Sequence, residues 1–173
     1  MRNNKKLINQ LLEKSKSRDK EIRENAVKKL GILNDSRAID PLIELVMSIQ
    51  SEDEFFIRVI IDSLALFGDL VVEPLIKVLS FMGDVLLEDA TFYIFDKFPA
   101  ISTKVLIECL KLSDFKDDET FLIRAIPLLV YLSPEKTHLE SIKPLLDSIL
   151  ISDYDEFQLK ENTRELLSKL TSL

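Results

Sequence analysis

A short apolar phrase recurs along this chain and limits what it can fold into. It occurs as IDPLIELV at Ile39–Val46, VEPLIKVL at Val72–Leu79, TKVLIECL at Thr103–Leu110 and IKPLLDSI at Ile142–Ile149, with a fifth copy, KLINQLLE, at Lys6–Glu13. The anchor residues Lys6, Pro41, Pro74, Val105 and Pro144 are 35, 33, 31 and 39 residues apart. A period of this length is typical of stacked supersecondary units. The sequence therefore predicts a solenoid.

The segments between the copies have the pattern of a second set of helices. In the first segment, apolar residues recur three and four positions apart, at Ile22, Ala26, Val27, Leu30 and Leu33. This spacing forms one apolar stripe along a helix. Similar segments span residues 52–69, 83–98, 117–132 and 155–170. We call the helices that begin at the repeated phrase B helices and the helices between them A helices, and the sequence predicts five of each.

Proline positions suggest where the B helices begin. Pro41, Pro74 and Pro144 open three copies of the phrase, and the first turn of a helix suits proline because its N–H has no internal acceptor. Pro127 falls inside the fourth A helix instead. We expect that helix to bend there.

The stretch EIRENAVKKLGILNDSRAIDPLIELV, from Glu21 to Val46, resembles a HEAT-like repeat of the type named after phycobilisome lyases. The matching positions are Gly31, Leu33, Asp35, Arg37, Ala38 and Pro41 to Ile43. The second repeat, Glu52 to Leu79, matches less closely, and later repeats keep only the helical pattern. The resemblance implies one all-α domain over residues 1–173. It would be a right-handed α-α superhelix, a HEAT-like solenoid of about ten antiparallel-paired helices, with B helices on the concave side.

Charge is distributed unevenly along the chain. Residues 1–30 hold ten Lys and Arg against four acids, and residues 31–173 hold thirteen against twenty-six, so balances of +6 and −13 give the net −7. An acidic body repels phosphate backbones, which disfavours nucleic acid as a partner. The basic N-terminal part is either a local exception or a solvated helix pair, and a solvated pair is the commoner case.

The sequence also suggests where the protein works. No apolar run is long enough for a membrane anchor or a signal, so we expect a soluble, cytoplasmic protein. The last helix can cover one face with charged residues, which predicts a complete array rather than a fragment. These residues are Lys160, Glu161, Arg164, Glu165 and Lys169.

Little in the sequence supports catalysis or metal binding. His138 is the only histidine, and we expect it to be exposed in a loop or helix start. With Cys109, expected to be a small core residue, it cannot complete a zinc site. HEAT-like deoxyhypusine hydroxylases bind iron through adjacent His-Glu pairs. His138 does not form such a pair, because Leu139 separates it from Glu140.

One acidic segment remains a possible cation site. It contains Asp114, Asp117, Asp118 and Glu119, although acids at a helix start are also expected from capping alone. We therefore predict no enzyme activity, no cofactor and no metal.

Two rows of polar residues on the B helices are the best candidates for a binding surface. The first row is Lys5, Asp40, Glu73, Lys104 and Lys143, and the second row, four residues further on, is Asn9, Glu44, Lys77, Glu108 and Asp147. We call these ten positions the B face. In three B helices the two rows carry opposite charges four residues apart. Each such pair could simply stabilise its own helix, by about 0.2–0.5 kcal/mol. Alternatively, the B face is a concave surface of mixed charge that binds a polar peptide or protein.

Aromatic residues offer a second candidate surface. Phe81, Phe115 and Tyr154 follow successive B helices, so they could anchor a partner along one edge or pack against their own helices. Phe92, Phe95 and Phe98 are expected in the core and Tyr93 outside it.

The leading functional hypothesis is a non-enzymatic scaffold or adaptor that binds a protein or peptide through the B face. One alternative, suggested by the resemblance alone, is an accessory subunit for chromophore or cofactor attachment. A HEAT-like DNA-binding repair protein is a weaker alternative, because the body is acidic and tryptophan is absent.

Overall fold

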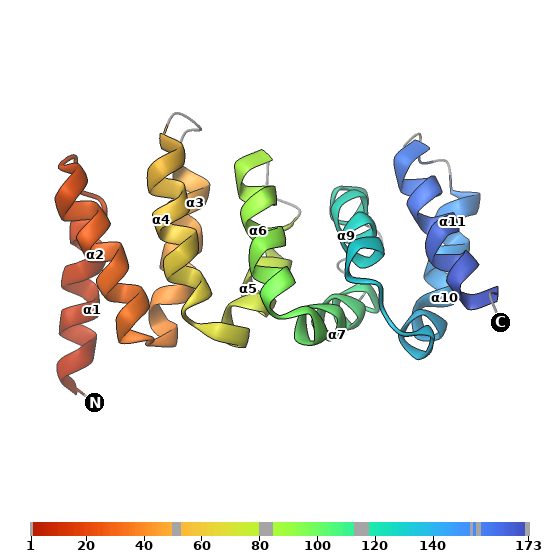
Figure 1. The fold of residues 1–173 in the computed structure, drawn as a ribbon, viewed down its shortest axis with the longest axis horizontal. Helices are drawn as coiled ribbons and strands as arrows, with labels where there is room; N and C mark the ends of the chain where they lie inside the picture. The colour runs from red at the N-terminus through yellow and green to blue at the C-terminus, as the bar shows by residue number, and fades with distance from the viewer. Residues whose placement is uncertain are drawn as a thin grey trace. The chain divides into compact units, whose positions relative to one another are not determined.

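The computed structural model describes residues 2–49, 53–79, 85–112, 118–152, 154 and 157–171, with side chains from residue 5 onward except those of residues 85–90 (Figure 1). Within these ranges all regular structure is helical. The α-helices are α1 (Arg2–Ser15), α2 (Lys20–Leu33), α3 (Ile39–Ser48), α4 (Glu54–Ala65), α5 (Val72–Lys77), α6 (Val85–Lys97), α7 (Pro99–Leu110), α9 (Glu119–Leu132), α10 (Lys136–Ile151) and α11 (Phe157–Thr171). Short 3₁₀ helices, η1 (Ser36–Ala38) and η3 (Gly68–Val71), precede α3 and α5. The predicted all-α fold of alternating B and A helices is confirmed.

Three A helices begin with the same cap. Asp19, Asp53 and Asp118 precede α2, α4 and α9, and each carboxylate accepts a hydrogen bond from the backbone N–H three residues on. The donor–acceptor distances are 3.1, 3.3 and 3.1 Å. Each cap satisfies an N–H that has no partner inside the helix, which fixes where the A helix starts.

Three A helices are also followed by a residue in the left-handed region. Asn34 after α2, Gly68 after α4 and Ser133 after α9 have φ values of 48°, 66° and 47°. Asn34 and Ser133 are the C-caps that end α2 and α9, whereas Gly68 is the first residue of η3, which follows the end of α4 at Ala65. Because these three positions are equivalent, they provide a structural register between repeats.

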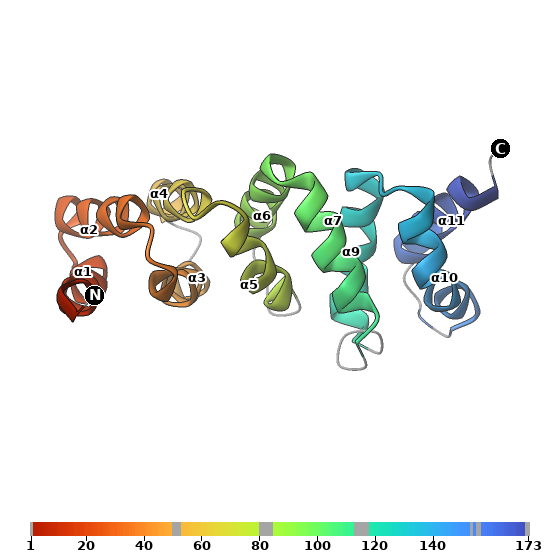
Figure 2. The ribbon, with the colours of Figure 1, turned by 90° about the horizontal axis from the view of Figure 1, so that it is seen from below.

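The chain divides into two compact units, and unit 1 consists of Met1–Leu75 with Met82–Lys97. Within it, α1 and α3 form one layer and α2, α4 and α6 form the other (Figure 2). Leu30, Leu42 and Ile60 are fully buried in the core. Helices α2 and α4 approach closely at Gly31, where a Cβ would lie 2.9 Å from the carbonyl oxygen of Ser63.

Unit 2 consists of Ile76–Phe81 and Phe98–Leu173. Here α10 packs against α7 and α11, while α9 packs against α7 and α11. Leu106, Phe121 and Leu146 are fully buried in its core. Arg124 of α9 donates a hydrogen bond of 2.7 Å from Nη1 to the carbonyl oxygen of Leu79, which ties an A helix to the end of a preceding B helix.

Two B helices begin earlier than the repeated phrase predicts. Pro41 and Pro74 lie in the first turns of α3 and α5, as expected. However, α7 begins at Pro99, before Thr103, and α10 begins at Lys136, so Pro144 lies inside the helix. The prediction that Pro144 starts a helix was wrong, because helical structure extends backwards from the phrase to Lys136. Pro127 lies inside α9 as predicted.

The aromatic predictions are confirmed in part. Phe95 is fully buried and Tyr93 is 43% exposed, as expected. Phe92 and Phe98 are only half-buried. Tyr154 is also half-buried, and the other two residues of the predicted aromatic edge, Phe81 and Phe115, lie outside the described residues.

Candidate partner-binding surface

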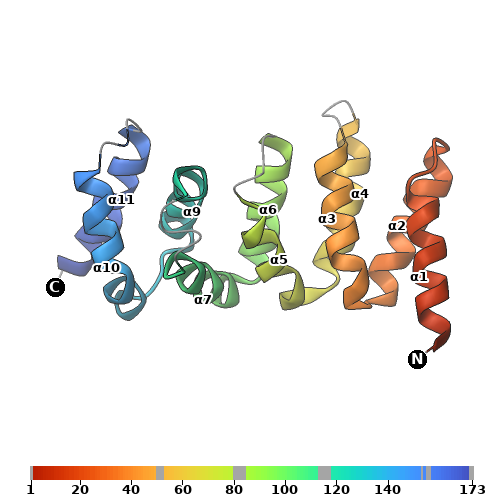
Figure 3. The same ribbon diagram turned by 180° about the vertical axis from the view of Figure 1, so that it is seen from behind.

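The B face is open to solvent at every position. All ten residues are exposed, from Lys5 and Asn9 on α1 to Lys143 and Asp147 on α10. In contrast, the Leu and Ile of the repeated phrase are buried, as at Leu42, Ile43 and Leu75. The phrase therefore forms the core, and the polar residues beside it face outward. Figure 3 shows α1 and α3 of unit 1 from the side of the B helices.

In unit 1 the B face changes charge from one helix to the next. Helix α1 contributes Lys5 and Asn9, and α3 contributes Asp40 and Glu44. Within the described part of the chain, neither acid of α3 forms an ion pair. Met47, at the C-terminal end of α3, is 38% exposed. This combination suits a partner with basic groups and a small apolar contact.

Intrahelical pairing explains only part of the charge pattern. In unit 2, Lys143 Nζ and Asp147 Oδ2 are 2.5 Å apart, which confirms one predicted pair. Lys104 and Glu108 on α7 form no such pair among the described contacts. Because both side chains of the Lys143–Asp147 pair are about half exposed, this pair adds little to stability. Helix support therefore accounts for Lys143 and Asp147 but, among the described contacts, not for Lys104 and Glu108.

The structure corrects the prediction for His138. It lies in the first turn of α10, at a helix start as expected, but it is half-buried rather than exposed. Its Nδ1 atom is enclosed and, in the part of the chain that the structure describes, has no hydrogen-bond partner. Among the described residues, no hydrogen bond therefore joins this atom to the nucleophile or orienting group that a general base requires.

The predicted acidic segment has a structural explanation. Asp118 caps α9, and Glu119 lies in the first turn of that helix. Asp114 and Asp117 lie outside the described residues. Among the residues that the structure places, no group of three or more His, Cys, Asp or Glu could hold a metal ion. Cys109 is buried in α7, as predicted for a core residue.

Arginines form links between repeats that sequence reasoning missed. Arg23 of α2 forms an ion pair with Asp53, the cap of α4, and its guanidinium lies 4.6 Å from the centre of the Phe56 ring. Arg58 occurs in the same Ile-Arg dipeptide but is exposed. The recurring Ile-Arg dipeptide was the signal in the sequence for this link. It did not identify the partner of Arg23, because Asp53 is 30 residues away along the chain.

A bidentate ion pair holds the turn before α3. Arg37 donates from Nε and Nη2 to the two carboxylate oxygens of Asp35, at 2.8 and 2.6 Å. These hydrogen bonds lower the pKa of Asp35 to about 2 and raise the pKa of Arg37. Asp35 also accepts from the backbone N–H of Arg37 at 3.2 Å, capping η1. The Asp-x-Arg part of the repeat therefore has a structural role.

A shallow hollow runs along the solvent side of α1. Its lining residues are Lys5, Lys6, Asn9, Gln10, Glu13 and Lys14. All of them belong to one helix, and the hollow is open to solvent, so it is not an enclosed small-molecule site. In the described part of the chain, no helix is both long and apolar enough to span a bilayer.

Comparison with known proteins identifies one repeat. Residues 22–46 match the family described as PBS lyase HEAT-like repeat. A crystal structure of an engineered protein is similar over 95% of this chain and 79% of its own, with 16% identity and a TM-score of 0.39. The designed armadillo repeat protein YIII(Dq)4CqI is similar over 93% of this chain and 98% of its own, with 12% identity and a TM-score of 0.33. A comparison with curated proteins found no match.

Proposed function

We propose that this HEAT-like repeat protein is a non-enzymatic scaffold or adaptor that binds a protein or peptide partner through its B face. The observation that carries the proposal is the separation of roles on each B helix. Residues that repeat, such as Leu42 and Leu75, are buried, whereas B-face residues are exposed and differ in charge between repeats. A surface that varies on a constant framework is what recognition of a particular partner requires.

The unpaired charges of α3 support this proposal further. Asp40 and Glu44 are exposed and can form ion pairs with a partner without first breaking pairs within the chain. Charges of this kind contribute to partner choice and association rate more than to affinity. The partner is therefore expected to be polar and to carry basic residues opposite α3.

The experiment exchanges charge signs without changing net charge. Glu44→Lys and Lys77→Glu are combined, and the tagged full-length chain is used to recover partners from its native cell extract. We expect recovery of the main partner to fall several-fold, because each ion pair that Glu44 or Lys77 forms with the partner is replaced by a repulsion. Far-UV circular dichroism should remain unchanged, since both side chains are exposed.

A matched control exchanges two charges on an A helix. Arg58→Glu and Asp62→Lys change exposed residues of α4 and also leave net charge unchanged. The control should recover the partner normally. Equal recovery with both double variants would show that the B face is not the binding surface.

A further inference from the structure

The first repeat differs from the second on one particular face. A shift of 35 residues aligns Lys6, Gln10 and Lys14 of α1 with Pro41, Leu45 and Ile49. The first three side chains are exposed, whereas the latter three are half-buried. Leu7 is 40% exposed, while its equivalent, Leu42, is fully buried. The face of α1 that corresponds to the packed side of α3 is therefore open.

Helices α2 and α4 differ in the same way, because exposed side chains of α2 correspond to buried side chains of α4. Aligning the left-handed residues Asn34 and Gly68 gives a shift of 34 residues, which places Asn25 opposite Val59 and Lys29 opposite Ser63. Val59 and Ser63 are buried, and Asn25 and Lys29 are exposed. Ile22 is 46% exposed, whereas its equivalent, Phe56, is 3% exposed.

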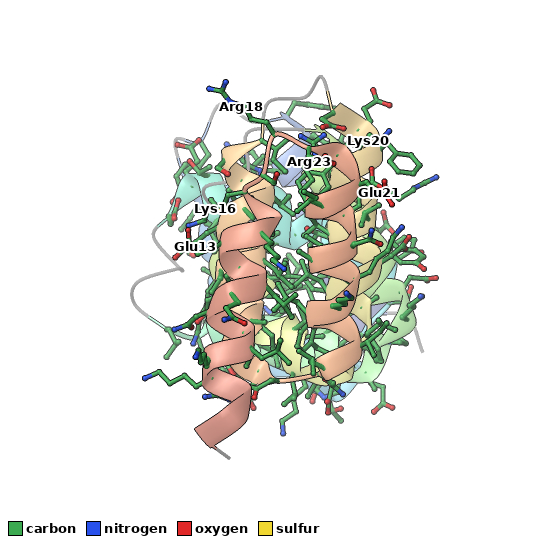
Figure 4. All side chains as sticks on the ribbon, turned by 90° about the vertical axis from the view of Figure 1, so that its left-hand side faces the viewer. Glu13, Lys16, Arg18, Lys20, Glu21 and Arg23 are labelled. Atoms are coloured by element: carbon green, nitrogen blue, oxygen red, sulfur yellow. The ribbon has the colours of Figure 1, made fainter. Side chains whose placement is uncertain are left out.

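Ser63 shows which face this is. It is the residue of α4 that meets Gly31 of α2, so this side of α4 packs against the preceding repeat. The corresponding side of α2, together with that of α1, forms the end of unit 1 seen in Figure 4. We call it the N-terminal end face. It consists of Lys6, Leu7, Gln10, Lys14, Ile22, Asn25 and Lys29.

The N-terminal end face is basic with an apolar component. It contains three lysines, and Glu13 lies beside it, since Glu13 lines the same hollow of α1 as Lys6, Gln10 and Lys14. None of the three lysines forms an ion pair within the described part of the chain. Lys16, Arg18 and Lys20 surround the nearby turn between α1 and α2 (Figure 4). Lys16 lies 3.8 Å from Glu13, while Lys20 and Lys28 share Glu24 at 3.8 and 3.9 Å. Cations therefore outnumber acids around this face.

We propose that the N-terminal end face binds an acidic amphipathic helix of a partner protein. A helix can pack here because the equivalent face of the second repeat packs against helices. Leu7 and Ile22 would contact its apolar stripe, and the three lysines would pair with its acids.

The same face of a second copy is also basic, so symmetric pairing would bring like charges together. Residues 31–97 hold thirteen acids against four basic residues, which would repel a nucleic acid that extended beyond the face.

The test measures binding of defined peptides to the full-length chain by fluorescence anisotropy. The probe is a labelled helical peptide with leucines at helical core spacing and glutamates at the flanking positions. A second peptide carries lysine in place of glutamate, and a third keeps the composition but scrambles the leucines. We expect the glutamate peptide to bind most tightly, and added salt to weaken its binding. Lys6→Gln combined with Lys29→Gln should weaken it by about three- to tenfold.

A matched control removes the same charge from unit 2. Lys111 and Lys136 are exposed, and Lys111→Gln combined with Lys136→Gln should leave peptide affinity nearly unchanged. Equal weakening by both double variants would overturn the proposal, because it would show only a net-charge effect. Failure of the glutamate peptide to bind, or equal binding of the scrambled peptide, would overturn it as well. An oligothymidine that bound more tightly, and was lost in the Lys6/Lys29 variant, would assign the face to nucleic acid instead.

Discussion

Gly31 shows how one residue sets the distance between neighbouring repeats. A Cβ at this position would lie 2.9 Å from the carbonyl oxygen of Ser63 and 3.0 Å from its Cα and Cβ. Two of these three atoms belong to the backbone, so a side-chain rotation cannot relieve the contact. The glycine of the repeat is therefore required by helix packing, since Gly31 lies inside α2 and does not end it.

Gly31→Ala should destabilise the protein despite a better helix propensity. Alanine gains roughly 1 kcal/mol over glycine inside a helix, but overpacking costs about 1–3 kcal/mol. We expect the free energy of unfolding in urea to fall by about 1 kcal/mol. Asn25→Ala, at an exposed site of the same helix, measures the propensity effect alone and should be neutral or slightly stabilising. A more stable Gly31→Ala variant would contradict the close contact.

Asp35 gives a prediction about pH. Its pKa is lowered from 3.8 to about 2, chiefly by the side-chain hydrogen bonds from Arg37. Because the folded-state pKa is the lower one, any stability that this pair provides is complete above the unfolded-state pKa. It is lost as the pH falls through the interval from about 4 to 2. The carboxyl carbon of Asp35 should titrate near pH 2 by NMR in the folded protein. In Arg37→Ala its pKa should move up towards 3.8, whereas an unchanged value would show that Arg37 is not the cause.

At the scale of helices, the position of a proline decides its effect. Pro41 lies in the first turn of α3, where a backbone N–H would have no intrahelical acceptor. Pro144 lies inside α10, where it removes a hydrogen bond to the carbonyl of Glu140. Pro144 is also exposed, so replacing it removes little packing. The same residue type in the same phrase therefore has opposite consequences in the two helices.

Pro144→Ala should stabilise the protein, by about 1–3 kcal/mol, because it restores a hydrogen bond and removes a steric conflict. Pro41→Ala is the control and should change the free energy of unfolding by less than about 1 kcal/mol. Urea unfolding followed by circular dichroism measures both variants. An equal effect of the two substitutions would mean that Pro144 does not interrupt α10.

The helices could be predicted from the sequence because their signals are local. Apolar spacing indicated the A helices and the repeated phrase indicated the B helices, and the first turn of α3 follows from Pro41. The start of α10 could not be predicted in this way, because aligning Pro144 with Pro41 assumed that equivalent residues occupy equivalent turns. The link from Arg23 to Asp53 was also missed, since it depends on two helices that meet only in the folded chain. Exposure of the B face was predicted, and its role in binding remains a proposal.

For the whole molecule, stability should be the sum of contacts between neighbouring helices. In unit 1, α2 packs against α1 and α4, and in unit 2, α11 packs against α9 and α10. Each unit has its own buried residues, such as Leu30 in unit 1 and Leu146 in unit 2. Repeat proteins with nearest-neighbour contacts can lose structure in one region while another remains folded. The two units are the natural candidates for such regions.

Leu30→Ala should therefore destabilise the units unequally. A buried leucine truncated to alanine costs about 2–5 kcal/mol, and Leu30 is fully buried between the helices of unit 1. Hydrogen exchange followed by mass spectrometry should show lost protection in peptides from α1 to α4 and retained protection in those from α9 to α11. Leu146→Ala should give the reverse pattern, because Leu146 is fully buried in unit 2. If either substitution lowered protection equally throughout the chain, the two units would unfold as one cooperative body.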